Sequence, residues 1–177
     1  MRPAPVARSS RVKTNPSPAE AVTTPASVAL MRAALAVAQR GRLAGEPPVG
    51  ACVVQDGQVI ASAHTAVIAG PDATAHAEIL ALRAACRHCR TPLLTDCELY
   101  VTVEPCPMCL AACHYAGITR VYYGAGLTAM QAVTGRELVA PVPTGITLTG
   151  GVLAGECAAL LAEWAASRTA SQKRRTP

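Results

Sequence analysis

Apolar residues between Ala26 and Leu43 recur at three- and four-residue intervals, the spacing that places them on one face of a helix. Two shorter apolar stretches, residues 49–55 and 58–64, follow this helix, and Asp56-Gly57 joins them. Aspartate followed by glycine favours the two-residue turn of a β-hairpin, because glycine readily adopts the positive φ that this turn requires. The opening pattern therefore predicts a helix followed by two antiparallel strands.

The rest of the chain alternates between helical and extended patterns. Helices are predicted over 73–89, 108–116, 128–133 and 152–167, and strands over 98–103, 118–123 and 146–149. A hairpin followed by alternating strands and helices favours one sheet that is covered on both faces. We therefore expect an α/β protein with three layers, α/β/α, in which helices cover both faces of a mixed sheet of about five strands.

Composition divides the chain into three parts. Residues 1–25 are basic and rich in proline, and this composition cannot bury enough apolar surface to fold, so we expect a disordered segment. Residues 26–168 carry the alternating pattern and form one domain. Residues 169–177 are expected to form a basic, flexible tail.

The formal net charge of +5 is unevenly distributed along the chain. Eight of the 16 basic residues lie in residues 1–19 and 168–177, which contain no acidic residue. Residues 20–167 hold the other eight basic residues against all 11 acidic ones. A domain that binds polyanions ordinarily presents a basic face, so the simpler interpretation of the two basic ends is that they are solvated.

The 177 residues are enough to bury one core without disulfide bonds. No stretch of eighteen apolar residues is present, so no membrane span is expected. The eight cysteines do not have the spacing of a small secreted protein, and the chain does not begin with the pattern of a signal peptide. These features predict a cytoplasmic location, where thiols stay reduced.

Four residues with metal-binding or acid–base side chains lie close together in the sequence: His76, Glu78, Cys106 and Cys109. One histidine and two cysteines provide the three ligands of a catalytic zinc, which keeps its fourth position open. Glu78 is not needed as a ligand and can carry the proton that a hydrolysis has to move. Both halves of the motif fall where a loop or strand enters a predicted helix, and a helix N-terminus favours thiolate over thiol.

A second interpretation uses two more cysteines. Cys86 and Cys89 precede Cys106 and Cys109 with sixteen residues between the pairs, which fits the four-cysteine spacing of a structural zinc module without catalysis. This interpretation leaves His76 without a role, and it places Cys86 and Cys89 inside a helical pattern.

Four stretches carry a resemblance to the cytidine deaminase superfamily, and within it to the branch of tRNA adenosine deaminases and guanine deaminases. They are residues 46–51 (EPPVGA), 72–78 (DATAHAE), 99–106 (LYVTVEPC) and 151–161 (GVLAGECAALL). The pattern H-x-E followed by P-C-x-x-C is the signature of zinc-dependent nucleobase deaminases. The resemblance covers roughly residues 26–168 and implies a cytidine deaminase-like fold.

By this resemblance, His76, Cys106 and Cys109 hold Zn²⁺, and Glu78 is the catalytic residue. Glu78 would shuttle protons while a zinc-bound hydroxide attacks the amidine carbon and ammonia leaves. Such a reaction is a hydrolysis, so no organic cofactor is implied. The resemblance also implies a homodimer with the substrate pocket near the subunit interface.

The residues expected to contact the substrate are Thr65, Ala77, Pro105 and Tyr115. Thr65 stands where both branches usually carry asparagine, and one hydroxyl cannot replace both hydrogen-bonding groups of an amide. Residues 124–135 contain no basic residue, whereas the tRNA enzymes carry a charged stretch there. These departures favour a free base or nucleoside, guanine-like or cytosine-like, as substrate. A tRNA adenosine-to-inosine deaminase is the alternative, supported by the basic residues 173–175. Tyr115 has a second interpretation as a core residue.

Overall fold

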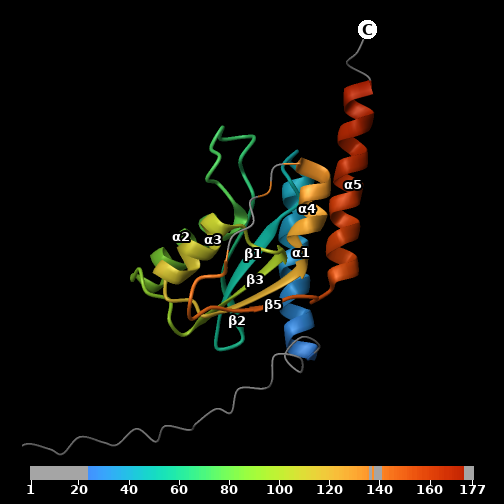
Figure 1. Ribbon diagram of the computed structural model, residues 1–177. Coiled ribbons are helices and arrows are strands. Elements are labelled where there is room, and N and C mark those ends of the chain that lie inside the picture. Colours follow the sequence, from blue (N-terminus) through green and yellow to red (C-terminus); the bar gives the residue numbers. More distant parts are fainter. Residues whose placement is uncertain (1–23, 136, 138–140, 174–177) are drawn as a thin grey trace, which may run out of the picture.

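The computed structural model describes residues 24–135, 137 and 141–173, with side chains as far as Arg168 (Figure 1). The elements are α1 (Pro25–Leu43), β1 (Gly50–Gln55), β2 (Gln58–His64), α2 (Ala77–Cys89), β3 (Cys97–Val103), α3 (Pro107–Tyr115), β4 (Arg120–Ala125), α4 (Leu127–Thr134), β5 (Thr147–Thr149) and α5 (Ala154–Lys173). Most of the segment that was predicted to be disordered, and the basic residues after position 173, lie outside the described residues.

The five strands form one sheet in the order β2-β1-β3-β4-β5. β1 pairs antiparallel with β2 and β3, whereas β3, β4 and β5 are parallel to one another. The prediction of a mixed sheet of about five strands is therefore confirmed. Parallel neighbours need a connection that crosses a face of the sheet, and α3 and α4 lie in these connections.

The helices form two layers, one on each face of the sheet (Figure 1). α2 and α3 cover one face, and α1, α4 and α5 cover the other. Ion pairs from Arg32 to Glu156 (2.8 Å) and from Arg42 to Glu163 (3.7 Å) join α1 to α5. This arrangement confirms the predicted three-layer α/β/α fold. Within the described residues, no helix combines the length and apolar character needed to cross a membrane.

The last helix is longer than the sequence pattern predicts. α5 continues to Lys173, whereas the apolar periodicity ends near residue 167. Residues 165–171 contain neither glycine nor proline, and alanine in this stretch has the highest intrinsic helix propensity, so nothing local ends the helix. Helix propensity without an apolar face explains the extra turn.

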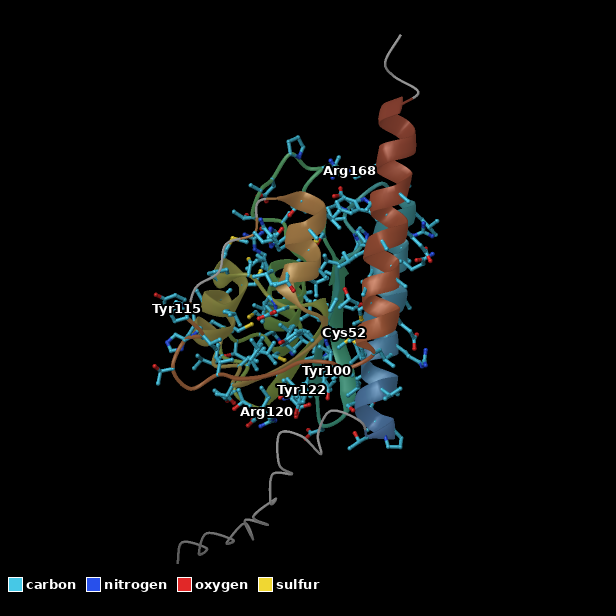
Figure 2. The ribbon with its side chains drawn as sticks, turned by 45° about the vertical axis from the view of Figure 1, so that its right-hand side comes forward. Cys52, Tyr100, Tyr115, Arg120, Tyr122 and Arg168 are labelled. Atoms are coloured by element: carbon cyan, nitrogen blue, oxygen red, sulfur yellow. The ribbon has the colours of Figure 1, made fainter. Side chains whose placement is uncertain are left out.

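Polar contacts mark the end of the sheet where β3 and β4 begin. Arg120 donates to Glu98 at 2.7 Å, and the rings of Tyr100 and Tyr122 stack with their centres 4.6 Å apart on neighbouring strands. Figure 2 shows Arg120, Tyr100 and Tyr122 together at this end. The residues of the H-x-E and P-C-x-x-C motifs lie at the opposite end, because the second motif follows the last residue of β3.

Gly50 allows β1 to lie directly under α1. A Cβ added at this position would contact the backbone of Ala34 and Ala38, which belongs to α1 and cannot move as a side chain could. Val49 and Ala51 are buried on either side of it, so the strand has no room to shift. The distance between this helix and the sheet therefore depends on a glycine.

We expect Gly50→Ala to lower the free energy of unfolding by about 1 to 3 kcal/mol, because the added Cβ pushes β1 away from α1. Gly155→Ala is the control, since nothing lies within 4 Å of its added Cβ, and its effect should stay within about 1 kcal/mol. Urea unfolding followed by circular dichroism measures both variants. Equal stability of Gly50→Ala and the unchanged protein would contradict this close packing.

Candidate active site

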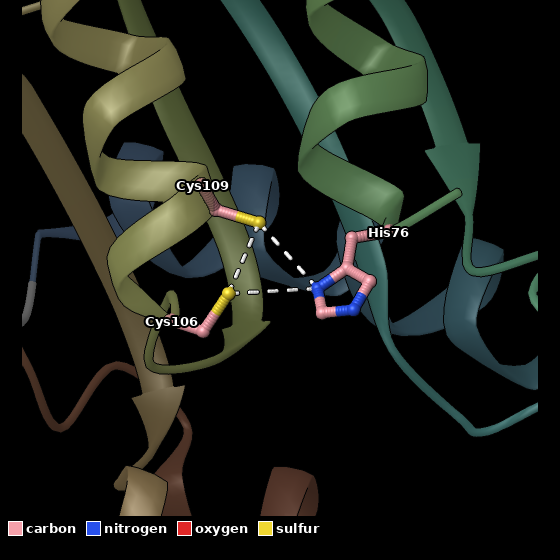
Figure 3. A group of neighbouring side chains, drawn as sticks. All are labelled: His76, Cys106 and Cys109. Carbon is pink, nitrogen blue, oxygen red and sulfur yellow. Dashed lines mark hydrogen bonds between the residues drawn. The ribbon is translucent and has the colours of Figure 1, made fainter. Parts of the chain in front are cut away.

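The N-termini of α2 and α3 bring the three proposed metal ligands together. His76 is the N-cap of α2, Cys106 is the N-cap of α3, and Cys109 lies in the first turn of α3. Neither side chain makes the usual capping hydrogen bond, and His76 Nδ1 and Cys106 Sγ instead lie 3.6 Å from each other. Figure 3 shows the three side chains facing one another across the gap between the two helices.

The distances within this group fit a zinc ion. His76 Nδ1 lies 3.6 Å from Cys106 Sγ and 3.5 Å from Cys109 Sγ, and the two sulfur atoms are 3.6 Å apart. Zinc bonds of about 2.3 Å to sulfur and 2.0 to 2.1 Å to nitrogen place tetrahedral neighbours about 3.5 to 3.8 Å apart. In the described part of the chain this is the one group of three or more such side chains close enough to hold a metal.

The two thiols differ in their acidity. A hydrogen bond with Cys109, together with the nearby His76, lowers the pKa of Cys106 to about 4. The same pairing with Cys106, together with burial, raises the pKa of Cys109, because a second negative charge beside the first is unfavourable. Interaction with Cys106 in turn raises the pKa of His76. Among the protein groups alone, the site therefore carries a thiolate at neutral pH, which is the form that binds metal.

Glu78 lies in the first turn of α2, beside this group, and its side chain is only 4% exposed. Burial raises the pKa of Glu78 to about 7, because removal from water disfavours the charged form. A carboxyl group with a pKa near neutrality can both accept and release a proton under physiological conditions. No ion pair among the described residues involves Glu78.

A cavity of about 560 Å³ opens in front of His76, Cys106 and Glu78. Its walls come from the residues after α1, the loop between β2 and α2, the end of β3, and α4. Most of the lining is apolar, including Val49 and Met130. No lysine or arginine among the described residues lines it. The volume is in the range of pockets that bind small molecules.

The four residues expected to contact the substrate occupy different places. Thr65 is 5% exposed and lines the cavity, close to the loop that leads to α2. Ala77 and Pro105 are buried next to the metal-binding residues in sequence but do not line the cavity. Tyr115 is 82% exposed on the outer end of α3, away from the cavity (Figure 2). The interpretation of Tyr115 as a core residue is therefore wrong.

Two glutamates that were not predicted as site residues hold segments of the cavity wall. Glu46 is buried and binds backbone N–H groups of the loop between β2 and α2. Glu104, directly before Pro105, accepts a hydrogen bond of 2.8 Å from the N–H of Leu127 at the start of α4. Both glutamates lie in stretches that carry the family resemblance, residues 46–51 and 99–106, but nothing in the sequence identifies their partners.

Cys86 and Cys89 do not join the metal-binding group. They lie in the last turn of α2, ten or more residues after His76, which corresponds to about 15 Å along the helix. The four-cysteine arrangement of a structural zinc module is therefore not formed.

Fold and site together define a protein of the cytidine deaminase type, with a zinc-binding group at the N-termini of α2 and α3. The family model described as "Cytidine and deoxycytidylate deaminase zinc-binding region" matches residues 26–125. The chain belongs to this family, and His76, Cys106 and Cys109 are its zinc ligands.

Three relatives illustrate the range of the family. The chain is 46% identical over 95 residues to a tRNA-specific adenosine deaminase of Aquifex aeolicus, covering 54% of this chain and 63% of that protein. It is 46% identical over 78 residues to the guanine deaminase of Bacillus subtilis, covering 44% of this chain and 50% of that protein. The solved structure of a guanine deaminase from Nitrosomonas europaea superimposes with a TM-score of 0.72 at 28% identity, covering 88% of this chain and 95% of that one. The chain thus spans less than two thirds of the first two relatives.

We expect Cys109→Ser to lose bound zinc, because a neutral hydroxyl replaces a thiolate ligand. The double variant Cys86→Ser/Cys89→Ser is the matched control and should keep one zinc per chain. Inductively coupled plasma mass spectrometry after dialysis measures the metal content. Loss of zinc from the double variant would instead support the four-cysteine arrangement.

Proposed function

We propose that this chain is a zinc-dependent hydrolase that releases ammonia from the exocyclic amino group of a nucleobase. One observation carries the proposal: a buried carboxyl group, Glu78, lines the same cavity as two of the zinc ligands, His76 and Cys106. A structural zinc site needs no such cavity and uses a fourth protein ligand. The membership of the family supports the same conclusion.

Each residue of the site has a distinct role in this proposal. His76, Cys106 and Cys109 hold the zinc, which when bound acts as a Lewis acid and makes water nucleophilic at neutral pH. Glu78 takes up the proton that the water loses and delivers it to the amine that leaves as ammonia. Its pKa of about 7 suits both steps.

The cavity favours a free base or a nucleoside as substrate. Glu78, Glu104 and Glu137 line it, and no described lysine or arginine does, so a phosphate group attached to the substrate would meet carboxyl groups and no lysine or arginine to pair with. Thr65 provides a hydroxyl toward the substrate, which can either donate or accept one hydrogen bond. A neutral ring with an amino group meets none of these electrostatic obstacles.

A tRNA substrate is the second candidate, because the chain resembles a tRNA-specific adenosine deaminase as closely as it resembles a guanine deaminase. In this case the cations that bind phosphate would come from outside the cavity. The basic residues 173–175, which support this candidate in the sequence, lie beyond the described side chains. The homodimer and the cytoplasmic location stay predictions of the sequence.

We expect Glu78→Gln to keep its zinc and to lose turnover by about a hundredfold to ten-thousandfold, because the ligands remain and the proton carrier is gone. Zinc content and the rate of ammonia release measure the two effects. Glu156→Gln is the control, since Glu156 is an exposed residue of α5 that pairs with Arg32. A Glu78→Gln protein that works at nearly the normal rate would refute this role.

We expect the zinc-loaded protein to release ammonia from one free base or nucleoside. The panel is guanine, guanosine, cytosine, cytidine, adenine, adenosine and unmodified tRNA, with Glu78→Gln as the blank. Activity on tRNA alone, falling steeply as salt rises, would support the second candidate, because added salt weakens contacts with phosphate. No release from any member, with zinc bound, would contradict the proposed function.

A further inference from the structure

A buried carboxylate that takes no part in the proposed chemistry lies at the edge of the cavity. Glu46 comes three residues after α1, and its side chain is 1% exposed. None of the ion pairs among the described residues includes it. A buried charge without a partner is strongly unfavourable, so the hydrogen bonds of this carboxylate have to compensate for its burial.

The partners of Glu46 are two consecutive backbone N–H groups of the loop between β2 and α2. The N–H of Ala69 donates to Oε1 at 2.7 Å, and the N–H of Ile68 donates to Oε2 at 3.0 Å and to Oε1 at 3.2 Å. Hydrogen bonds to an ionised acceptor are shorter and stronger than neutral ones. The carboxylate therefore binds the loop at Ile68 and Ala69, although the side chain of Ile68 is exposed to solvent.

The backbone of Glu46 is itself fixed, because its N–H donates to the carbonyl of Gly41 in α1 at 2.9 Å. The residues that flank the two ends of the contact line the cavity. Pro47 and Val49 follow Glu46 within three residues, and Thr65 and Val67 precede the two N–H groups that it binds. One side chain thus joins two walls of the cavity that are separate in sequence.

Two backbone hydrogen bonds also hold the loop, and both involve residues other than Ile68 and Ala69. The N–H of Thr65 donates to the carbonyl of Val49 at 3.0 Å, and the N–H of Ala66 donates to the carbonyl of Ala75 at 2.9 Å. These bonds hold the two ends of the loop, which stands out from the body between β2 and α2 (Figure 1). Glu46 holds its middle.

We propose that Glu46 is a positioning residue for the substrate, which fixes the part of the wall at Val67 against the wall formed by Pro47 and Val49. This inference rests on the proposed function of the cavity. No hydrogen bond or ion pair among the described residues joins Glu46 to a zinc ligand or to Glu78, so it acts through the position of Val67 on the substrate-facing side. Its loss loosens substrate binding and leaves the proton transfer intact.

Two variants remove different numbers of the hydrogen bonds between Glu46 and the loop. Glu46→Ala removes all three hydrogen bonds. Glu46→Gln, with its amide oxygen at the position of Oε1, keeps the bond from Ala69 and the longer bond from Ile68, and loses the bond to Oε2. Glu98→Gln is the matched control, because Glu98 is a half-buried carboxylate that pairs with Arg120 at the opposite end of the sheet.

The first measurement is amide hydrogen exchange, which does not depend on activity. In the zinc-loaded protein we expect the amide protons of Ile68 and Ala69 to be protected. Their exchange should be at least about tenfold faster in Glu46→Ala and less affected in Glu46→Gln, with the amides of β1 unchanged. Glu98→Gln should leave Ile68 and Ala69 protected. Protection that persists in Glu46→Ala would overturn the proposal.

The second measurement is steady-state kinetics on the member of the panel from which the unchanged protein releases ammonia fastest. We expect KM to rise about threefold in Glu46→Gln and about tenfold or more in Glu46→Ala, with kcat within about twofold. An unchanged KM despite lost protection, or a loss confined to kcat, would overturn the positioning role. If the wild-type protein releases ammonia from no member of the panel, the proposed function is refuted. The hydrogen-exchange result then decides by itself whether Glu46 anchors the loop.

Discussion

The packing of α2 beside α3 on one face of the sheet is the constraint on which the site depends. Each helix begins at the same edge, so the residues at their first positions meet although thirty residues of chain separate His76 from Cys106. Helix N-termini carry partial positive charge, which favours a thiolate ligand at the point where the two helices begin. Metal binding and the buried acid of Glu78 therefore follow from one arrangement of two helices.

Much of this arrangement can be read from the sequence because its signals are local. The hairpin at Asp56-Gly57 and the alternating pattern predict the layers. The two motifs predict the metal ligands, because each lies at the start of a helix. The cavity walls cannot be predicted in this way. They depend on which distant segments pack over the ligands, and periodicity carries no information about that. Tyr115 illustrates the limit: it shares α3 with Cys109, but six residues later the helix has carried it to an exposed end.

Acidic residues shape the cavity through the backbone as well as through their charge. Glu46 and Glu104 both accept hydrogen bonds from N–H groups of a neighbouring segment, the first from the loop before α2 and the second from the start of α4. A carboxylate held in this way joins two segments without any cation. The cavity can thus be firmly built without any lysine or arginine among its described lining residues, and the proposal of a neutral substrate rests on this combination.

The three zinc ligands lie within residues 76–109. The cavity walls also include nine residues from outside this range: Pro47, Val49, Thr65, Val67, Ala73, Leu127, Met130, Thr134 and Glu137. The residues that bind the metal and many of the residues that form the cavity walls therefore come from different stretches of the chain. A substitution or insertion in a wall segment can change the molecule that fits without disturbing the ligands. Evolution can then keep one reaction and exchange its substrates, and the relatives named for tRNA adenosine and for guanine are consistent with such a history.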